Sequence, residues 1–309
     1  MALYPTYTVA GEKMDDPWGR WELVHGSRVL PTFPGRRLSS WNVPGQPGDV
    51  SAAYAPGEAA SFPLRFRINA IENSSGQYVS GGTEARLRVL QANLDLLYQK
   101  ILLAKQGYQG MVEVRHYAQA SSYRRVSARV ITASELEWDA YSEYAYVTLI
   151  FEAPTGVWTA PAFDVTSMTI TKPQTSFRIE VPAGTAPMIE NMVCFNPGAT
   201  SLLSAAPARL AASGGPHGGF RLGTQDSSVL LPANKWTMVN TLHWKYGFTS
   251  GASDWGSPKP YRGLIEPNGR PMGSALTLLP EGDSGKAYLW VWGPRAGVQV
   301  RIRSRKAWF

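Results

Sequence analysis

The chain reads LRFRINAI over residues 64–71 and TEARLRVLQANLDLLYQKILLAK over residues 83–105, and these two patterns decide the fold of its N-terminal half. In the first, Leu64, Phe66 and Ile68 alternate with polar residues, as in a β-strand with one buried face. In the second, apolar residues recur at steps of three and four, which predicts an amphipathic helix. These residues are Leu87, Leu90, Leu94, Leu97 and Ile101.

The predicted helix has one apolar stripe, which lasts about two heptads and is too short for a stable free-standing coiled coil. Packing against a sheet of its own domain is therefore the preferred interpretation. Strands are predicted at 111–117, 125–132 and 145–154, without helices between them, whereas a parallel doubly wound sheet needs a helix at each crossover. An aromatic-bearing strand is also expected at Trp18–Leu30. The N-terminal half is predicted to be an antiparallel β domain carrying one helix.

Residues 31–49, PTFPGRRLSSWNVPGQPGD, contain four prolines and three glycines, which excludes a helix interior or a central strand. An extended, turn-punctuated arm is predicted. Flexible linkers are poor in large side chains, yet this segment has several, so we expect it to lie on its own domain or on a neighbouring subunit. A long surface loop pinned by Trp41 is the alternative. The candidate interface residues are Phe33, Arg36, Arg37, Trp41 and Val43.

The C-terminal half begins after the run PTGVWTAP at Pro154–Pro161, which we take as the link between a domain of residues 1–155 and one of residues 156–309. Beyond it, about eight short strands separated by turn residues predict a β-sandwich or jelly roll. They are expected at 165–171, 176–181, 192–195, 229–231, 236–242, 276–279, 287–292 and 298–303. The fold class is thus mainly β.

The composition limits the function classes. The 309 residues carry a net charge of +7, but their basic residues alternate along strands and no nucleic-acid module accompanies them, so sequence-specific nucleic-acid binding is not expected. The single cysteine, Cys194, excludes an intrachain disulfide, and we expect it to be a small buried apolar residue. Neither a membrane span nor a secretion signal is found, so folding in a cytoplasm is expected.

Enzyme signatures are missing from the sequence. None of GxSxG, HExxH, GxxxxGK[ST] or a strand-borne GxGxxG occurs, and the four histidines have no metal-ligand neighbour at short spacing. The remaining candidates for a glycosidase pair are three local carboxylate groups: Asp15 with Asp16, Glu135 with Glu137 and Asp139, and Glu281 with Asp283. We expect no enzyme activity, no cofactor and no metal.

One aromatic segment, HWKYGFTSGASDWGSPKPY at residues 243–261, has the residue types that stack on sugar rings or give stiff contact area to a partner. A core or loop-anchoring aromatic cluster is the alternative. The candidate contact residues are Trp244, Tyr246, Trp255 and Tyr261.

Three stretches together resemble the distal tail proteins of long-tailed bacteriophages, which are often described as minor tail proteins. They are VPGQPGD in the arm, FEAPTGVW at the link, and the closing pair YLWVWG and VQVRIRSR. The resemblance implies an N-terminal ring-forming β domain and a galectin-like C-terminal sandwich. Galectins bind sugar through a strand bearing NPR, whereas this chain has CFNPG, with Phe195 and Gly198 in place of polar ligands. The resemblance therefore does not carry lectin activity over.

The resemblance also implies a function and partners. A homo-oligomeric ring, a hexamer in that family, would form at the distal end of the tail tube. It would join the tube to the tail tip, baseplate or host-recognition apparatus. The expected partners are the major tail tube protein, a tail tip or hub protein, the tape measure protein and a host surface glycan, without a membrane. The protein would reside in the virion after assembly in the host cytoplasm. The alternative function is a carbohydrate-binding sandwich for host polysaccharide.

Overall fold

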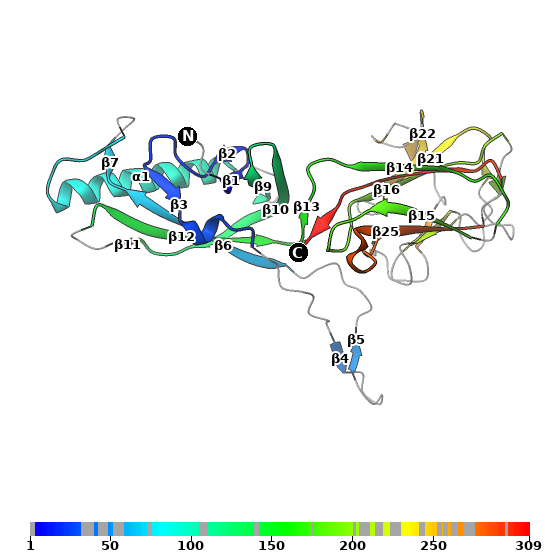
Figure 1. Ribbon diagram of the computed structural model, residues 1–309, viewed down its shortest axis with the longest axis horizontal. Helices are drawn as coiled ribbons and strands as arrows, with labels where there is room; N and C mark the ends of the chain where they lie inside the picture. Colours follow the sequence, from blue (N-terminus) through cyan, green and yellow to red (C-terminus); the bar gives the residue numbers. More distant parts are fainter. Residues whose placement is uncertain are drawn as a thin grey trace. The chain divides into compact units, whose positions relative to one another are not determined.

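The structure is a computed structural model that divides into two compact units (Figure 1). Unit 1 comprises residues 1–37, 57–161 and 309, and unit 2 comprises residues 38–56 and 162–308. Apart from Phe309, unit 1 thus runs to Pro161, the last residue of the run PTGVWTAP. The described residues are 4–31, 40–42, 49–51, 59–72, 76–104, 110–138, 142–174, 176–199, 202–203, 211–213, 219–222, 230–240, 245–251, 255, 259–260, 265–267, 276–293 and 296–309.

Unit 1 is built on an antiparallel sheet with the strand order β2–β1–β9–β10–β12–β6–β3. This sheet and α1 (Thr83–Ala104), the one α-helix among the described residues, confirm the predicted β domain with one helix. The strands of this order are β1 (Thr6–Val9), β2 (Glu12–Lys13), β3 (Trp21–Leu23), β6 (Ala60–Asn69), β9 (Val112–Gln119), β10 (Ser122–Ala133) and β12 (Tyr144–Ala153). Shorter strands are β7 (Ile71–Glu72), β8 (Gln77–Tyr78), β11 (Glu137–Trp138) and β13 (Trp158–Thr159).

The sheet of unit 1 curls because one long strand serves two neighbours. Residues 122–128 of β10 pair with β9, whereas residues 129–133 pair with β12, and the register shifts between Val130 and Thr132. An irregularity of this kind bends a strand and increases its twist. The curled sheet encloses an aromatic core, in which Phe62 and Phe151 stack with ring centroids 5.4 Å apart.

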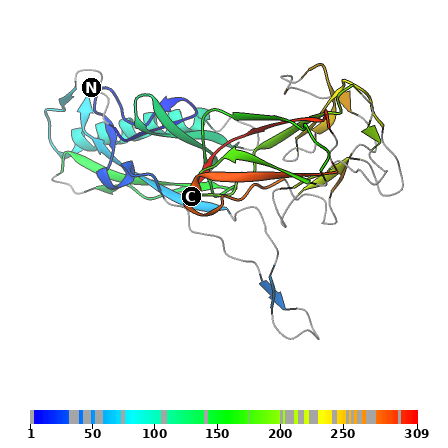
Figure 2. The same ribbon diagram turned by 45° about the vertical axis from the view of Figure 1, so that its right-hand side comes forward.

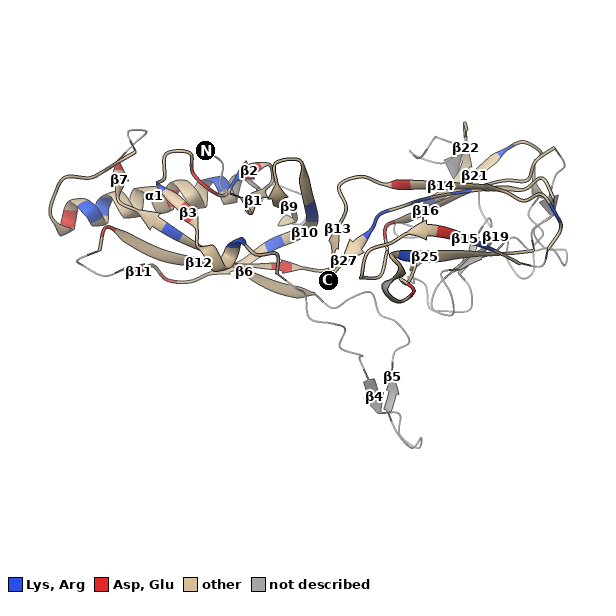
Figure 3. Ribbon diagram, in the orientation of Figure 1, with Lys and Arg blue, Asp and Glu red and all other residues tan. Residues whose placement is uncertain are grey.

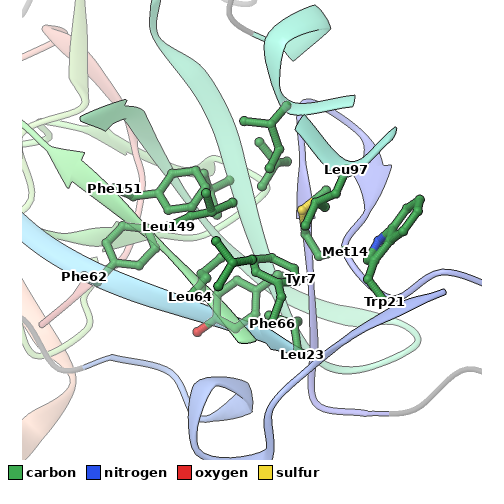
Figure 4. Packing of buried hydrophobic residues seen from close by; sticks show 14 of the residues in the cluster. Tyr7, Met14, Trp21, Leu23, Phe62, Leu64, Phe66, Leu97, Leu149 and Phe151 are labelled. Carbon is green, nitrogen blue, oxygen red and sulfur yellow. The ribbon is translucent and has the colours of Figure 1, made fainter. Parts of the chain in front are cut away.

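Helix α1 covers the sheet with the apolar stripe predicted from the sequence. Leu90, Leu94, Leu97 and Ile101 are at most 5% exposed and join the core of unit 1. Figure 4 shows Leu97 directed at Met14, with Trp21 nearby. The first predicted member of the stripe is wrong.

Leu87 is 40% exposed, and Val89 is buried in the first turns instead. The helix is further tied down by a buried amide, because Asn93 Nδ2 donates to the carbonyls of Asn69 and Ile71 at 2.8 and 3.0 Å.

Within the described residues, no helix is long and apolar enough to span a bilayer.

The strand predicted at Trp18–Leu30 is much shorter in the structure, and this part of the prediction is wrong. Only β3 is extended, and it is followed by the 3-10 helix η1 (His25–Arg28). On the other side, the Asp16 carboxylate accepts hydrogen bonds from the backbone N–H groups of Trp18 and Arg20, which closes a tight turn. Local side-chain bonds of this kind compete with strand pairing.

Unit 2 contains two antiparallel sheets, with the orders β14–β26–β16–β21–β22–β23 and β15–β25–β18–β19–β24 (Figure 1, Figure 2). The six-stranded sheet consists of β14 (Asp164–Thr169), β16 (Asn191–Asn196), β21 (Trp236–Asn240), β22 (Lys245–Thr249), β23 (Lys259–Pro260) and β26 (Gln299–Ser304). The five-stranded sheet consists of β15 (Ser176–Pro182), β18 (Ala211–Ser213), β19 (Phe220–Leu222), β24 (Ile265–Pro267) and β25 (Lys286–Trp292). Remaining elements of unit 2 are β4 (Ser40–Asn42), β5 (Asp49–Ser51), β17 (Leu202–Leu203), β20 (Leu230–Leu231), η4 (Gly282–Ser284) and β27 (Ala307–Trp308).

The two sheets pack face to face as a sandwich. Phe195 of one sheet meets Phe220 of the other edge-on, with ring centroids 6.1 Å apart and both side chains fully buried. Seven of the eight predicted strands are present with shifted ends. The prediction of a strand at 276–279 is wrong, because this segment makes only isolated bridges, such as Met188 with Leu278.

Replacing Leu97 by Ala is expected to lower the free energy of unfolding by about 3 kcal/mol, because it leaves a cavity between α1 and the sheet. The adjacent Leu96, which is 38% exposed, is the control, and Leu96→Ala should cost less than about 1 kcal/mol. Urea unfolding followed by far-UV circular dichroism measures both values. Equal losses would contradict the placement of the buried stripe.

Candidate functional site: the base of the arm and the faces of the sandwich

Two aromatic side chains hold the chain by its backbone where it enters the arm. The hydroxyl of Tyr7, on β1, donates to the carbonyl of Val29 at 3.0 Å. The indole Nε1–H of Trp158, on β13, donates to the carbonyl of Pro31 at 3.2 Å. Both side chains are fully buried, so the two carbonyls are fixed to the core of unit 1.

A third carbonyl of the same stretch is held by His116 on β9. Its Nε2 lies 3.0 Å from the carbonyl oxygen of Arg28, and because a carbonyl only accepts, Nε2 carries the hydrogen. The imidazole packs edge-on against Tyr7, with centroids 4.8 Å apart, and is 6% exposed. Burial lowers the pKa of His116, so the ring is neutral at pH 7.

The arginine at this position is itself clamped by a carboxylate. Arg28 forms a two-pronged ion pair with Asp15, with N–O distances of 2.9 and 2.6 Å, and its Nη1 also donates to the carbonyl of Pro5. Asp15 accepts further hydrogen bonds from Thr6 and from the backbone of Leu23. The guanidinium is nearly buried, so this pair fixes the geometry of the base.

Asp16 does not bind Arg28. Its carboxylate binds Arg20 instead, with N–O distances of 2.8 and 3.0 Å. Burial opposes ionisation of Asp16, but the hydrogen bonds and charge of Arg20 outweigh it and lower the pKa of the carboxyl. Each carboxylate of the Asp15 and Asp16 pair is thus engaged with its own arginine. The carboxyl of Asp16 therefore lacks the raised pKa that a general acid would need.

Most of the predicted interface residues of the arm fall outside the described residues, namely Phe33, Arg36, Arg37 and Val43. Trp41 lies in β4, which pairs with β5 in a register that places Trp41 opposite Val50. The chain re-enters unit 1 at β6, whose first residue, Ala60, pairs with Ala153. The role of these residues as an interface stays a prediction.

The predicted aromatic contact residues do not share one face. Tyr246 opposes Val239, which is fully buried between the sheets, and therefore points to the inner face. Trp255 lies on the outer face of the same sheet, since its ring centroid is 5.9 Å from the guanidinium carbons of both Arg301 and Arg303. Trp244 and Tyr261 are outside the described residues.

The resemblance to galectins fails at a defined position. Gly198 has φ +81°, and a Cβ added there would lie 2.6 Å from the carbonyl oxygen of Gly297. Its N–H is held by the side chain of Asn196 at 2.8 Å. Glycine is therefore required where an NPR strand has arginine.

The sequence analysis missed a second aromatic surface, on the outer face of the five-stranded sheet. Tyr288, Trp290 and Trp292 alternate along β25 with the buried Leu289 and Val291. The signal was present in the sequence as KAYLWVW, a strand whose two faces are both apolar. In the sequence analysis this stretch indicated a strand and part of the resemblance to distal tail proteins, but not an aromatic surface.

Two of the other candidate carboxylates, Glu137 and Glu281, enter surface ion pairs. Glu137 lies 2.6 Å from Arg65, and Glu281 lies 4.0 Å from Arg178. Among the described residues, there is no cluster of three or more His, Cys, Asp or Glu side chains suited to a metal ion. Cys194 is fully buried, as predicted.

No protein-family model and no curated protein matches the chain. Among solved structures, the Dit protein of phage SPP1, described as a paradigm of the hub adsorption apparatus of phages that infect Gram-positive bacteria, has a TM-score of 0.54. It is 14% identical over 98% of this chain and 99% of its own. The two chains share a fold. The activated baseplate of phage P2, with calcium or with strontium, also matches, at a TM-score of 0.35, 8% identity and 98% coverage of both chains.

Replacing Asp15 by Asn is expected to lower the free energy of unfolding by about 3 kcal/mol, because the nearly buried guanidinium of Arg28 loses its counter-charge. The control is Asp95→Asn on the exposed face of α1, which should change stability by less than about 0.5 kcal/mol. Thermal and urea unfolding measure both. A neutral effect of Asp15→Asn would show that the clamp is dispensable.

The lowered pKa of His116 makes the stability of unit 1 depend on pH. The unfolded chain binds this proton near the ordinary value of 6.5, but the folded chain binds it only at lower pH. The stabilisation is therefore complete above pH 6.5 and is lost as the pH falls towards the folded pKa. His116→Gln should flatten this part of the profile between pH 7.5 and 5.

Urea titrations at several pH values measure the profile. The exposed His25 is the control, and His25→Gln should keep the wild-type slope. The same slope in His116→Gln and in the wild type would assign the pH dependence to other groups.

Proposed function

We propose that the protein is a structural component of a tailed-phage virion, a distal tail protein that forms a ring at the end of the tail tube. The observation that carries this proposal is the shared fold with the SPP1 Dit hub protein over nearly the whole length of both chains. The order of elements agrees with the resemblance found in the sequence: an arm, a one-helix β domain and a sandwich with sheets of six and five strands. The sandwich is proposed to be galectin-like in fold and to lack the galectin sugar site.

A ring needs a heterologous interface that closes, in which one surface of each copy binds a different surface of the next. The arm is proposed to supply one of these surfaces and to strap each copy to its neighbour. Its base suits this use, because the three fixed carbonyls limit the directions in which the arm leaves unit 1. A preorganised, proline-rich segment also loses less entropy on binding. We propose six copies in the ring.

In this role the protein has no catalytic activity and no cofactor. The proposed partners are the major tail tube protein on one side and a tail tip or hub protein on the other, with the tape measure protein passing through. The proposed location is the tail tip of the virion, after assembly in the host cytoplasm.

The ring is tested by the mass of the purified protein and by negative-stain microscopy. Multi-angle light scattering is expected to give about six times 33.8 kDa, alone or after mixing with tail tube protein, and micrographs should show rings with a central hole. Replacing residues 38–52 by Gly-Ser-Gly keeps the anchored base but removes the arm. This variant should remain folded and shift to monomer.

The matched control is Trp18→Ala, which removes a 48% exposed aromatic from the same unit and should leave the ring mass unchanged. Circular dichroism verifies folding of each variant. The proposed strap would be refuted if the wild type stayed monomeric both alone and with tail tube protein, or if rings formed equally well without the arm.

A further inference from the structure

The outer face of the five-stranded sheet carries a single row of aromatic side chains that no role described so far uses. Tyr288, Trp290 and Trp292 occupy alternate positions of β25, so they project from the same face. The two indoles have centroids 6.1 Å apart and planes within 22° of parallel. Trp292 is 38% exposed, and Tyr288 and Trp290 are half-buried.

Polar groups lie along one side of this row. The guanidinium carbon of Arg178, on the neighbouring strand β15, is 3.8 Å from the ring centroid of Tyr288. Glu180 is directly opposite Tyr288 in the register and pairs with Lys286 at 2.9 Å. The face therefore offers flat apolar rings together with exposed donors and acceptors.

The row is too narrow for a protein partner. A fully buried aromatic side chain contributes about 150–250 Å², so three that are already more than half covered present less than about 375 Å². A stable interface needs about 800 Å² on each partner. The positions beside the row are Ser176, Arg178 and Glu180 on β15 and Ala211 and Ser213 on β18, so the large apolar residues are confined to one strand.

The local charge favours an uncharged ligand. Two cations are matched by two carboxylates, because Lys286 pairs with Glu180 at 2.9 Å and Arg178 pairs with Glu281 at 4.0 Å. Unit 2 as a whole is basic, because residues 38–56 and 162–308 contain 15 of the 30 Lys and Arg but only 9 of the 23 Asp and Glu, which is +6 of the net +7. Figure 3 shows where the described charges lie on the unit 2 strands, with Asp and Glu in red on β14 and β15 and Lys in blue at the start of β25. An anionic polymer would therefore be drawn to other surfaces, such as the face of Arg301 and Arg303.

We propose that this row is a binding site for an uncharged polysaccharide. The C–H faces of successive pyranose rings pack on Trp290 and Trp292, because weakly positive C–H groups are attracted to the negative face of an aromatic ring. Arg178 donates hydrogen bonds to hydroxyl groups of the sugar, and Glu180 accepts hydrogen bonds from them. The site is distinct from the face that bears Trp255. It adds a host-surface contact to the proposed tail-tip role without requiring the ring.

The test uses the full chain and an array of purified bacterial surface polysaccharides with neutral and anionic members. The wild type is expected to bind at least one neutral member, and affinity electrophoresis with that polysaccharide gives the dissociation constant. Trp290→Ala and Trp292→Ala should each weaken binding about tenfold or more, whereas Trp292→Phe should retain part of it. Trp255→Ala, on the other sheet, is the matched control and should bind as the wild type does.

Binding of no neutral polysaccharide, binding of anionic members alone, or equal binding by Trp290→Ala and the wild type would each overturn the proposal. So would a loss confined to Trp255→Ala, which would move the site to the six-stranded sheet. Light scattering of the same variants separates this result from the proposed function, because ring mass should be unaffected in Trp290→Ala and Trp292→Ala.

Discussion

The fixed carbonyls of residues 28, 29 and 31 are the constraint on which the arrangement of unit 1 depends. A buried carbonyl needs a donor, and here three aromatic side chains from β1, β9 and β13 supply one each. The same contact brings Tyr7, His116 and Trp158 together as a cluster of rings. The short strands at this end of the sheet and the departure of the arm are thereby set by a single network.

The Arg28–Asp15 pair completes this network at a cost in desolvation that only good geometry offsets. Asp15 also accepts from the backbone of Leu23, so the pair joins β3, η1 and the loop after β2. Removing either partner leaves a nearly buried charge or an unpaired backbone group. The proposed strap between subunits would need such a fixed base, since flexibility at the base would weaken the contacts that a strap makes.

Because side chains alternate along each strand, the sheets of both units have an inner face that packs in a core and an outer face that carries other residues. In unit 1 the inner face of β6 and β12 carries Phe62 and Phe151, while Arg65 and Arg67 on the outer face lie 4.6 and 4.4 Å from the rings of Tyr146 and Tyr144. In unit 2 the inner faces form the sandwich core, and the outer faces carry arginines beside Trp255 on one sheet and the tryptophan row on the other. On such a scaffold the residues available for binding lie on the outer faces, because the side chains of the inner faces pack in the core.

Local patterns made much of the fold predictable. The period of two in residues 64–69 and the steps of three and four in residues 83–105 depend only on near neighbours. The helix α1 was therefore found almost to its ends, and β6 was found with its start predicted four residues late. The strand predictions were wrong at two places where the local sequence preference did not decide the backbone conformation. Asp16 folded the expected strand at residue 18 into a turn, and Leu278 makes a lone bridge in place of a strand.

The sequence by itself determined the class of fold, the single helix, the seven correctly placed strands of the sandwich and the absence of familiar enzyme motifs. Only the tertiary structure decided which polar groups meet. The donors at the base of the arm lie 22, 88 and 127 residues from their carbonyls, and Asp15 and Asp16 choose different arginines although they are adjacent. Tyr246 and Trp255, nine positions apart, were assigned to opposite faces. Such partnerships depend on how distant strands align, and no local periodicity encodes that alignment.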